Sequence, residues 1–574
     1  MIRTLMKSIR QYKKASIETP LFVSLEVVLE CLIPFVMSML INNMTENDIM
    51  PVIKYGLILF VMASFSLLFG VLSARAAATA SAGFAKNLRQ DLFFKIQDYS
   101  FGDIDKFSVS SLVTRMTTDV TNVQNAFQMI IRIAVRTPLM IIFSMIMSFT
   151  MNWKMACIFL IMVPILTAAI LGIAIYVFPI FKRIFKKYDA LNNSVQENVS
   201  GMRVVKSFVR EDFEKDKFAR AANDVCNDFT YVEKILAFNN PIMMFCIYLV
   251  MLLVSFFGAR MIISSGGTAL DTGKLSSLIT YGIQILSSIM MLAMIFVMSS
   301  IASESAVRIV EVLNHESALK TPENGIKEIS DGKIVFDNVS FKYSEKSKRN
   351  ALENINLNIE SGSTVGIIGG TGSGKTTLIQ LISRLYDVTE GSITVGGKDV
   401  REYDLNALRD SVSVVLQKNV LFSGTIKENL RWGNKEATDE EIINVCKLAC
   451  ADEFVSQFPD KYDTYIEQGG TNVSGGQKQR LCIARALLKK PKILILDDST
   501  SAVDTKTDAL IRNAFAKEIP DTTKIIIAQR ISSVQDADMI VVMDKGKIAE
   551  MGTHKELMEV NGIYKEVFES QNRN

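Results

Sequence analysis

The sequence predicts a two-part membrane protein, in which an all-α domain with six membrane-spanning helices precedes an α/β domain. The chain has 574 residues, more than one hydrophobic core accommodates. It is 49% hydrophobic and only 21% charged, and its mean hydropathy is +0.24. Long apolar runs are confined to the first half, whereas short β-branched strands alternate with helical segments in the second half. These three observations define the predicted fold class.

Six apolar runs are each long enough to cross the ~30 Å hydrocarbon core of a bilayer as a helix. They are residues 20–42, 52–74, 130–151, 155–181, 240–263 and 276–302. We expect the first run to remain in the mature protein, because Glu26, Glu30 and Pro34 interrupt it and no signal-peptide cleavage pattern follows.

The distribution of basic residues predicts the orientation in the membrane. Lys and Arg gather before the first run and between the fourth and fifth, whereas outer loops such as 42–50 are short and poor in both. We therefore expect both termini and the second domain on the cytoplasmic side of a plasma membrane. The connections 76–129 and 182–239 are long, charged and free of proline, which predicts helices that extend beyond the bilayer.

The domain boundaries follow from changes in composition. The membrane domain is expected over residues 1–313, a polar linker over 314–332 and the α/β domain over 333–574. The net charge of +3 gives no overall basic field of the kind that nucleic-acid binders use, and the membrane runs exclude a soluble nucleic-acid ATPase. With two histidines in the chain, we expect neither a histidine metal site nor a Ser-His-Asp triad.

A P-loop follows the predicted strand Thr364–Ile368. Its residues are Gly369, Gly370, Thr371, Gly372, Ser373, Gly374, Lys375, Thr376 and Thr377. The glycines let backbone N–H groups close around phosphates, and the following helix points its positive end at them. Lys375 is predicted to reach the β- and γ-phosphates and the Thr376 hydroxyl to bind Mg²⁺. The motif predicts a site for ATP and Mg²⁺.

A second motif supplies a metal ligand. The apolar run Ile493–Leu496 ends in Asp497, so a buried strand delivers a carboxylate to the Mg²⁺ beside the P-loop. This is the pattern of a Walker B motif, and the two motifs together predict nucleotide binding.

A third segment, between these two motifs, opens an amphipathic helix. Its first residues are Ser474, Gly475, Gly476 and Gln477. Six membrane helices followed by a nucleotide domain with this Ser-Gly-Gly-Gln segment resemble a half-transporter of the ATP-binding cassette exporter family, over essentially the whole chain. The resemblance implies a dimer in which each ATP lies between the P-loop of one chain and the Ser-Gly-Gly-Gln helix of the other.

The resemblance also assigns roles to single residues and segments. Tyr343 is similar to the aromatic that stacks on adenine, Gln417 to the glutamine that contacts Mg²⁺ and the attacking water, and Asp504 to the aspartate that couples the two composite sites. Residues 101–111 and 206–210 occupy the places of coupling helices that dock on nucleotide domains. The alternatives are a plain strand aromatic for Tyr343 and ordinary amphipathic turns for the two segments.

Two catalytic positions depart from the family pattern. Where the family has the glutamate that orients and deprotonates the attacking water, this chain has Asp498, which is one methylene shorter. Where the family has a histidine that contacts the γ-phosphate, this chain has Gln529, which cannot become a cation. We therefore expect ATP binding to survive better than hydrolysis at this chain's own site.

The intact Ser474–Gln477 segment serves a partner's P-loop, so the asymmetry predicts a heterodimer with a second, non-identical half-transporter. ATP-driven closure of the nucleotide domains would switch the membrane helices from inward to outward access. The alternatives are a homodimeric lipid flippase with two slow sites and an ATP-gated channel or regulatory membrane subunit.

The substrate is expected to be a hydrophobic or amphipathic compound, a drug or a lipid, taken from the membrane. The 28 methionines, many of them in the apolar runs, suit an adaptable lining. Glu26 and Glu30 lie one helical turn apart within the first run, where carboxylates are costly. Either they attract a cationic substrate or they bond to neighbouring helices or to Arg75, and the sequence leaves both readings open.

Overall fold

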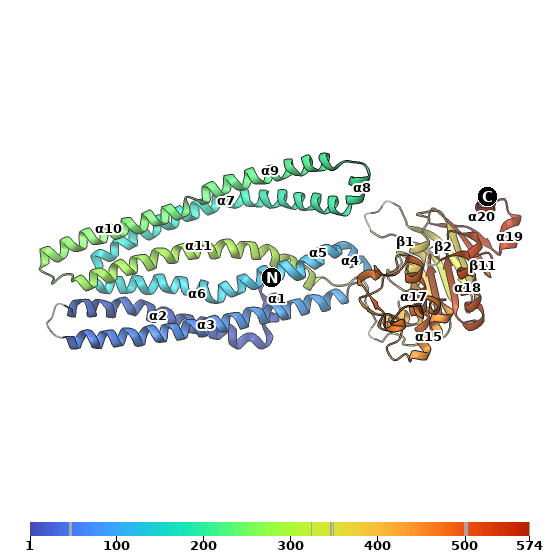
Figure 1. The fold of residues 1–574 in the computed structure, drawn as a ribbon, viewed down its shortest axis with the longest axis horizontal. Helices are drawn as coiled ribbons and strands as arrows, with labels where there is room; N and C mark the ends of the chain where they lie inside the picture. The colour runs from blue at the N-terminus through green and yellow to red at the C-terminus, as the bar shows by residue number, and fades with distance from the viewer. Residues whose placement is uncertain (45–48, 323, 345–346, 348, 499–502, 573–574) are drawn as a thin grey trace. The chain divides into compact units, whose positions relative to one another are not determined.

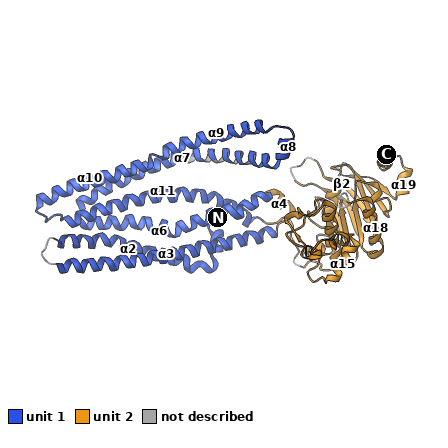
Figure 2. Ribbon diagram, viewed as in Figure 1, with its two compact units in different colours: residues 1–97, 108–315 blue, residues 98–107, 316–574 orange. Residues whose placement is uncertain are grey.

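The computed structural model describes residues 1–574 except 45–48, 323, 345–346, 348, 499–502 and 573–574, and it leaves the side chains of residues 178, 182, 185, 186, 189 and 193 undescribed. The described chain forms two compact units (Figure 2). Unit 1 comprises residues 1–97 and 108–315, and unit 2 comprises residues 98–107 and 316–574. The short segment 98–107 thus groups with the second half of the chain.

Unit 1 is built from long helices that run side by side (Figure 1). Its elements are α1 (Ile2–Met6), the 3₁₀ helix η1 (Lys7–Tyr12), α2 (Lys13–Asn43), α3 (Ile49–Gln97), α5 (Val109–Thr114), the π-helix η2 (Arg115–Asp119), α6 (Val120–Met151), α7 (Trp153–Ser200), α8 (Met202–Ser207), α9 (Glu211–Leu236), α10 (Asn239–Ser265) and α11 (Thr272–Asn314). Among the described residues, six helical stretches are long and apolar enough to cross a membrane, which confirms the six predicted spans.

Several of these helices continue well past their apolar runs. The apolar run in α3 ends near residue 74, yet the helix extends to Gln97, and α7 extends to Ser200. Beyond its apolar part α7 packs along α9 (Figure 1). The predicted helical extensions are therefore confirmed.

Polar side chains fix where the membrane helices begin and how they pair. Asn152, in extended conformation, caps α7 by accepting hydrogen bonds from the N–H groups of Lys154 and Met155 at 3.0 and 3.2 Å. The hydroxyl of Tyr281 in α11 donates to the carbonyl of Cys31 in α2 at 2.7 Å. Tyr281 is fully buried in an apolar cluster built from α6, α7, α10 and α11.

The described residues of unit 2 form three β-sheets. Its strands are β1 (Ile334–Phe341), β2 (Leu352–Ile359), β3 (Thr364–Gly369), β4 (Glu390–Val395), β5 (Lys398–Asp399), β6 (Val412–Val415), β7 (Gly424–Thr425), β8 (Tyr465–Ile466), β9 (Ile493–Asp497), β10 (Thr523–Ile527), β11 (Met539–Asp544) and β12 (Lys547–Gly552). The six-stranded sheet has the order β12-β11-β3-β10-β9-β6 and is parallel except for β12. The predicted parallel α/β sheet is confirmed.

The remaining elements of unit 2 are helices. They are α4 (Phe101–Phe107), α12 (Lys375–Ile382), α13 (Leu405–Ser411), α14 (Ile426–Leu430), α15 (Asp439–Leu448), α16 (Asp452–Val455), η3 (Lys461–Asp463), η4 (Gln468–Gly470), α17 (Gly475–Leu488), α18 (Thr505–Glu518), η5 (Ile531–Ser533), α19 (His554–Glu559) and α20 (Ile563–Asn572).

The six-stranded sheet is buried on both faces. Successive residues of β9 alternate between two apolar clusters: Ile493 and Ile495 face one cluster, and Leu494 and Leu496 face the other. This double burial explains why β9 is a continuous apolar run, as expected for a central parallel strand. It also fixes the carboxyl end of the strand, where Asp497 lies.

Candidate active site

The predicted catalytic residues follow the carboxyl ends of neighbouring parallel strands. In the order β3-β10-β9-β6, the P-loop follows β3, Gln529 follows β10, Asp497 ends β9 and Gln417 follows β6. Ligands of open α/β sheets bind at this edge. The strand order therefore brings together residues that lie up to 160 positions apart in the sequence, from Gly369 to Gln529.

The P-loop backbone requires glycine at two positions. Gly369 has φ +152°, and a Cβ atom there would lie 2.2 Å from the carbonyl oxygen of Met543. Gly374 has φ +100°, and its Cβ would lie 2.8 Å from a methyl carbon of Leu352. The loop can therefore bring its backbone N–H groups close together only because these side chains are absent.

Lys375 begins α12 and reaches back over the loop. Its Nζ donates to the carbonyl oxygens of Gly369 and Gly370, at 2.8 Å each. Burial lowers the pKa of Lys375, and the carboxylates of Asp497 and Asp498 oppose that shift. The cation is thus held at the mouth of the loop by weak carbonyl acceptors that phosphate oxygens can replace.

A cavity of about 530 Å³ opens beside the P-loop. Its lining residues are Tyr343, Arg349, Asn350, Ala351, Gly372, Ser373, Gly374, Lys375, Thr376, Thr377, Lys545 and Gly546. Tyr343 is half exposed, and its hydroxyl lies 2.9 Å from that of Thr377. A flat aromatic at the rim of a cationic cavity suits stacking on a nucleotide base.

The sequence prediction did not include Arg349 or Lys545 among the residues of this cavity. Lys545 lies in the turn between β11 and β12, and β11 pairs with β3, so the turn comes to the P-loop only through the strand order. The Gly546 N–H donates to the Ser373 carbonyl at 3.0 Å, which fastens the turn to the loop. No local sequence motif predicts that Arg349 or Lys545 lines the cavity.

Two oxygen donors converge where the Mg²⁺ is predicted. The hydroxyl of Thr376 donates to Asp497 at 3.1 Å, and Asp497 is 3% exposed. A hydroxyl and a buried carboxylate are the hard oxygen ligands that Mg²⁺ takes together with phosphate oxygens. Burial raises the pKa of the Asp497 carboxyl, and the hydrogen bond from Thr376 opposes this. Mg²⁺ held there would neutralise charge on the phosphates.

The two residues that depart from the family pattern contact each other. The side-chain amide of Gln529 donates to Asp498 Oδ2 at 2.7 Å, and the amide of Gln417 approaches the same oxygen at 3.4 Å. Asp498 is 9% exposed and adopts φ +48°, with its N–H bonded to the Ile527 carbonyl at 3.0 Å. One carboxylate oxygen of Asp498, the predicted catalytic base, is therefore engaged by two amides.

Ser474 and Gln477 form a reciprocal cap at the start of α17. The Ser474 hydroxyl accepts from the Gln477 N–H at 3.3 Å, and the Gln477 side chain accepts from the Ser474 N–H at 2.9 Å. Ser474 and Gly475 are exposed. None of the described residues that line the P-loop cavity belongs to Ser474–Gln477. The segment is thus capped, exposed at its first two residues and not part of the described lining of its own chain's cavity.

Asp504 has a structural role in the folded chain. It caps α18 and accepts hydrogen bonds from the N–H and the hydroxyl of Thr507, at 3.0 and 2.7 Å. These hydrogen bonds lower the pKa of the Asp504 carboxyl. Asp504 is not among the described residues that line the P-loop cavity.

Tyr386, which the sequence prediction missed, lies between α4 and Tyr343. Its hydroxyl donates to Asp105 in α4 at 2.9 Å, and its ring meets that of Tyr343 edge-on at 5.3 Å. The ring of Phe101, also in α4, lies 6.4 Å away. The predicted docking of residues 101–111 is thus confirmed for α4, which touches an aromatic neighbour of the nucleotide cavity. For residues 206–210, docking on a nucleotide domain stays a prediction.

In unit 1 the partner of the two membrane carboxylates is Arg136 of α6. Its guanidinium donates to Glu26 at 2.5 Å and to both oxygens of Glu30 at 2.8 and 2.7 Å. Arg75, the partner considered from the sequence, forms no ion pair with either carboxylate in the described part of the chain. Gly70 of α3 leaves room for Glu26, because a Cβ there would lie 3.2 Å from its carboxylate. The triad joins α2 to α6 beside α3.

The fold and the site together define an ATP-dependent membrane transport protein: a P-loop domain with a Walker B carboxylate follows six membrane-spanning helices. Residues 19–290 match the family profile of the ABC transporter transmembrane region, and residues 352–501 match that of the ABC transporter. The chain belongs to the ABC transporter family. Its nucleotide domain is a transport ATPase that binds ATP with Mg²⁺ on the cytoplasmic side of the membrane.

Relatives of similar length support this assignment. The uncharacterized ABC transporter ATP-binding protein YfiB of Bacillus subtilis is 36% identical over 547 residues, which cover 95% of this chain and 94% of the relative. An uncharacterized ABC transporter ATP-binding protein of Mycobacterium bovis is 33% identical over 578 residues, which cover 100% of this chain and 98% of the relative. The structure of a bacterial Atm1-family ABC exporter with ATP bound has the same fold, with a TM-score of 0.84, 23% identity and coverage of 98% of both chains.

Proposed function

We propose that this chain is the ATP-holding half of a heterodimeric exporter of hydrophobic or amphipathic compounds, in which its own site turns over slowly. The observation that carries the proposal is the contact between Gln529 and Asp498. ABC exporters act as dimers. The proposal adds that the two halves differ in sequence and in catalytic rate.

The chemistry of Asp498 supports a slow site. Its side chain is one methylene shorter than glutamate, and a displacement of about 1 Å at a catalytic group costs on the order of 10²-fold in rate. Two amides donate to the oxygen that would have to accept a proton from water. The attacking water would have to displace these amides before it could donate to that oxygen. Gln529 itself has no titratable proton to place on a phosphate.

The binding machinery, by contrast, is complete. Lys375, Thr376 and Asp497 converge beside the cavity, and Tyr343 stands at its rim. A site that retains these groups holds ATP whether or not it hydrolyses it. ATP binding here would stabilise the closed nucleotide dimer by its differential affinity for that state.

The exposed start of α17 supports a role in the partner's site. A helix N-terminus is an anion site. At α17 the reciprocal cap uses the N–H groups of Ser474 and Gln477, and Gly475 between them is exposed. We expect the start of α17 to complete a fast site on the partner's P-loop. That partner should carry glutamate and histidine at the positions of Asp498 and Gln529, together with an altered Ser-Gly-Gly-Gln segment.

The triad of Glu26, Glu30 and Arg136 supports a cationic group on the substrate. Two carboxylates and one guanidinium leave one net negative charge inside the membrane domain, and such a charge is costly unless a cation or a proton compensates it. The side chains of Glu30 and Arg136 remain 24% and 33% exposed, so a ligand can reach them. The side chain of Glu26 is only 8% exposed, so Glu26 is the buried member of the triad.

ATP turnover of the assembled transporter tests the proposal. We would purify the chain alone and with a candidate partner half-transporter from the same genome, with the partner's Walker glutamate intact or replaced by glutamine. We expect little activity from the chain alone and loss of nearly all activity when the partner's glutamate is replaced. Robust turnover by the chain alone would make Asp498 a working base and favour a homodimer.

The substrate class has a separate test. Uptake of a lipophilic fluorescent cation and of a neutral dye into proteoliposomes is compared for the wild type and the Glu30→Gln variant. We expect Glu30→Gln to reduce uptake of the cation alone. Equal effects on both dyes would remove the cation reading and leave the triad with a structural role.

A further inference from the structure

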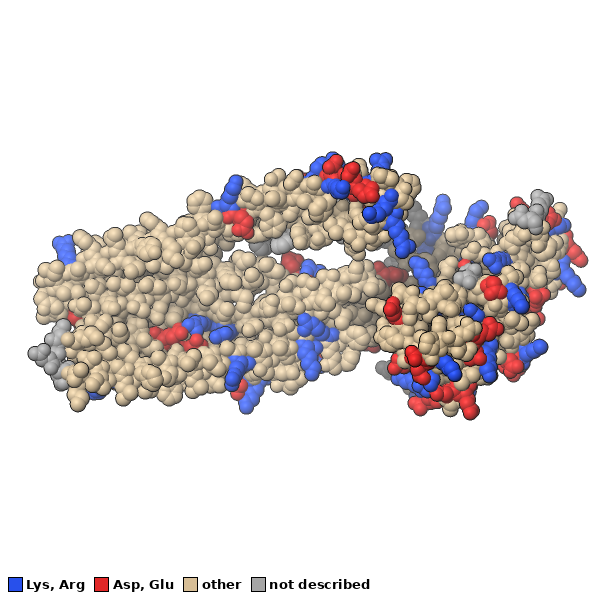
Figure 3. Space-filling view, in the orientation of Figure 1, with Lys and Arg blue, Asp and Glu red and all other residues tan. Residues whose placement is uncertain are grey.

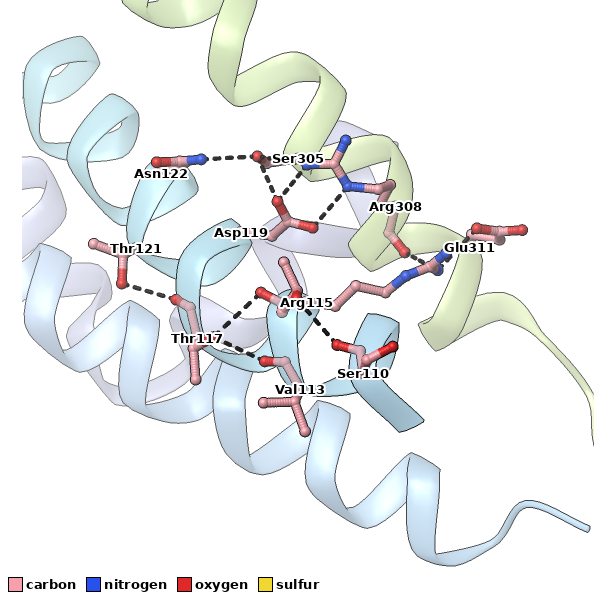
Figure 4. A network of polar contacts seen from close by, with 11 residues as sticks. Ser110, Val113, Arg115, Thr117, Asp119, Thr121, Asn122, Ser305, Arg308 and Glu311 are labelled. Carbon is pink, nitrogen blue, oxygen red and sulfur yellow. Dashed lines mark hydrogen bonds and ion pairs between the residues drawn. The ribbon is translucent and has the colours of Figure 1, made fainter. Parts of the chain in front are cut away.

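A dense polar network joins η2 and the start of α6 to the end of α11 in unit 1 (Figure 4). Asp119, the last residue of η2, is 1% exposed and accepts from Arg308 Nε at 2.8 Å, from Arg308 Nη2 and from the Ser305 hydroxyl at 2.8 Å. Asn122 of α6 donates to the same hydroxyl at 3.1 Å. The carboxylate is thus gripped by a two-pronged guanidinium, the strongest form of such a pair.

A second ion pair lies beside the first. Arg115, the first residue of η2, donates to Glu311 at 2.8 Å and to the backbone carbonyl of Arg308 at 2.8 Å. The net charge of the four side chains is therefore zero, because η2 and α11 each contribute one cation and one anion and each cation faces an anion of the other helix. Ser305, Arg308 and Glu311 follow one another at three-residue spacing, so they share one side of α11.

The backbone at this point is unusual. Residues Arg115–Asp119 form a π-helix, in a chain where the neighbouring elements are α-helical. π-helical turns are rare and are frequently found at functional sites. Here the turn begins and ends with the two residues that contact α11. The irregularity and the network coincide.

The network lies next to both points where the chain passes between the two units. The chain enters unit 1 from residues 98–107 only a few residues before Arg115, and it leaves unit 1 a few residues after Glu311. Both routes by which movement of the nucleotide domain can reach α6 and α11 through the chain therefore start at this network. The two connecting segments also contact each other within unit 2, because the Ser317 hydroxyl donates to Asp103 at 2.8 Å.

We propose that Asp119 and Arg308 are positioning residues for transport: they lock α6 to α11, so that nucleotide-driven movement of segment 98–107 and of the chain after residue 315 reaches both membrane helices as one displacement. Without the lock, each connection would move its own helix. ATP would still bind and turn over, but the membrane helices would not switch together. The inference rests on the transport activity of the family and is independent of the heterodimer.

The test measures the distance between α6 and α11 in the full assembled transporter. Nitroxide labels are attached to cysteines introduced at the exposed positions Asn125 and Val307, and distances are recorded without nucleotide and after trapping with ATP and vanadate. The native cysteines that are not buried, Cys157, Cys226 and Cys450, are replaced by serine. For the wild type we expect one distance population in both states. For Asp119→Asn we expect a second population on trapping, and a loss of transport per ATP of about tenfold, within the usual range of coupling between sites.

Rescue separates positioning from folding. The charge swap Asp119→Arg with Arg308→Asp is expected to restore one distance population, and Arg308→Lys, which keeps the charge without the two-pronged contact, is the fallback should the swap fail to fold. Asp212→Asn, in the exposed pair with Lys215, is the matched control and should behave as wild type. Either of two results would overturn the proposal: a wild-type α6–α11 distance that changes on trapping, or an Asp119→Asn variant that behaves as wild type. It is also overturned if folded variants lose ATP turnover and thermal stability in parallel without a second distance population.

Discussion

The side-chain amide of Gln529 donates a 2.7 Å hydrogen bond to the carboxylate of Asp498. From the sequence, these are the two catalytic positions predicted to depart from the family pattern, and the fold places them in contact. β9 and β10 are parallel neighbours with Asp497 opposite Ile527, so the residues that follow both strands meet. The two departures therefore act on one site, and a change at one position alters the surroundings of the other.

Restoring both catalytic residues should activate this site. In a transporter whose partner glutamate is replaced by glutamine, we expect Asp498→Glu with Gln529→His to raise ATP turnover by about 10²-fold, because the base regains its reach and loses the amide that occupies it. The measurement is phosphate release by the assembled transporter. Asp521→Glu, at an exposed loop position of unit 2, makes the same chemical change away from the site and should have no effect. Unchanged turnover in the double variant would contradict the assignment of these two residues.

Tyr386→Phe should separate nucleotide binding from its transmission to α4. The substitution removes the hydrogen bond to Asp105 and leaves the ring against Tyr343. We expect unchanged affinity for a fluorescent ATP analogue, a decrease of about 1 kcal/mol in the free energy of unfolding, and less transport per ATP. Tyr465→Phe, at an exposed tyrosine of unit 2, is the control. A weakened ATP affinity in Tyr386→Phe would place the residue in the binding site instead.

Removing Arg136 should destabilise unit 1 strongly. The substitution Arg136→Gln leaves the buried Glu26 and the partly exposed Glu30 without a cation. Breaking a fully buried ion pair typically costs about 3–5 kcal/mol, which is an upper bound here because Glu30 and Arg136 are partly exposed. Thermal unfolding of the purified protein in detergent measures the loss. Replacing all three residues by glutamine should recover most of the stability, because no unpaired charge remains. A triple variant as unstable as Arg136→Gln would show that shape rather than charge holds the triad.

Gly369→Ala should prevent the P-loop from forming. The added Cβ would lie 2.2 Å from the Met543 carbonyl at a φ of +152°, and a strained backbone of this kind costs roughly 1–3 kcal/mol before the clash is counted. We expect loss of ATP binding, measured with a fluorescent analogue, and a lower unfolding temperature. Gly370→Ala, whose Cβ would have nothing within 4 Å, should leave the unfolding temperature unchanged.

Much of the architecture was predictable because its signals are local. An apolar run of membrane length, a glycine-rich loop between a strand and a helix, and an apolar strand that ends in Asp497 each carry their meaning within a few residues. Figure 3 shows a similar division of charge: the part of unit 1 far from α8 is mostly tan apart from one group of red and blue side chains, whereas both signs gather over the α8–α9 end of unit 1 and over unit 2. Hydropathy and motif spacing report these properties directly.

Which residues pair across long distances was decided by the tertiary structure. Arg136 lies 106 residues from Glu30, and Asp105 lies 281 residues from Tyr386. The sequence offered Arg75 as a partner for the membrane carboxylates, but a residue of α6 occupies that place because α2 packs against α6. By itself, then, the sequence determined the spans and the nucleotide motifs, since these depend on periodicity and local chemistry; that Asp498 and Gln529 are altered catalytic positions stays a prediction. Helix packing and strand order alone decided the ion triad, the Asp119–Arg308 network and the contact of Gln529 with Asp498, since no local pattern encodes which distant elements become neighbours.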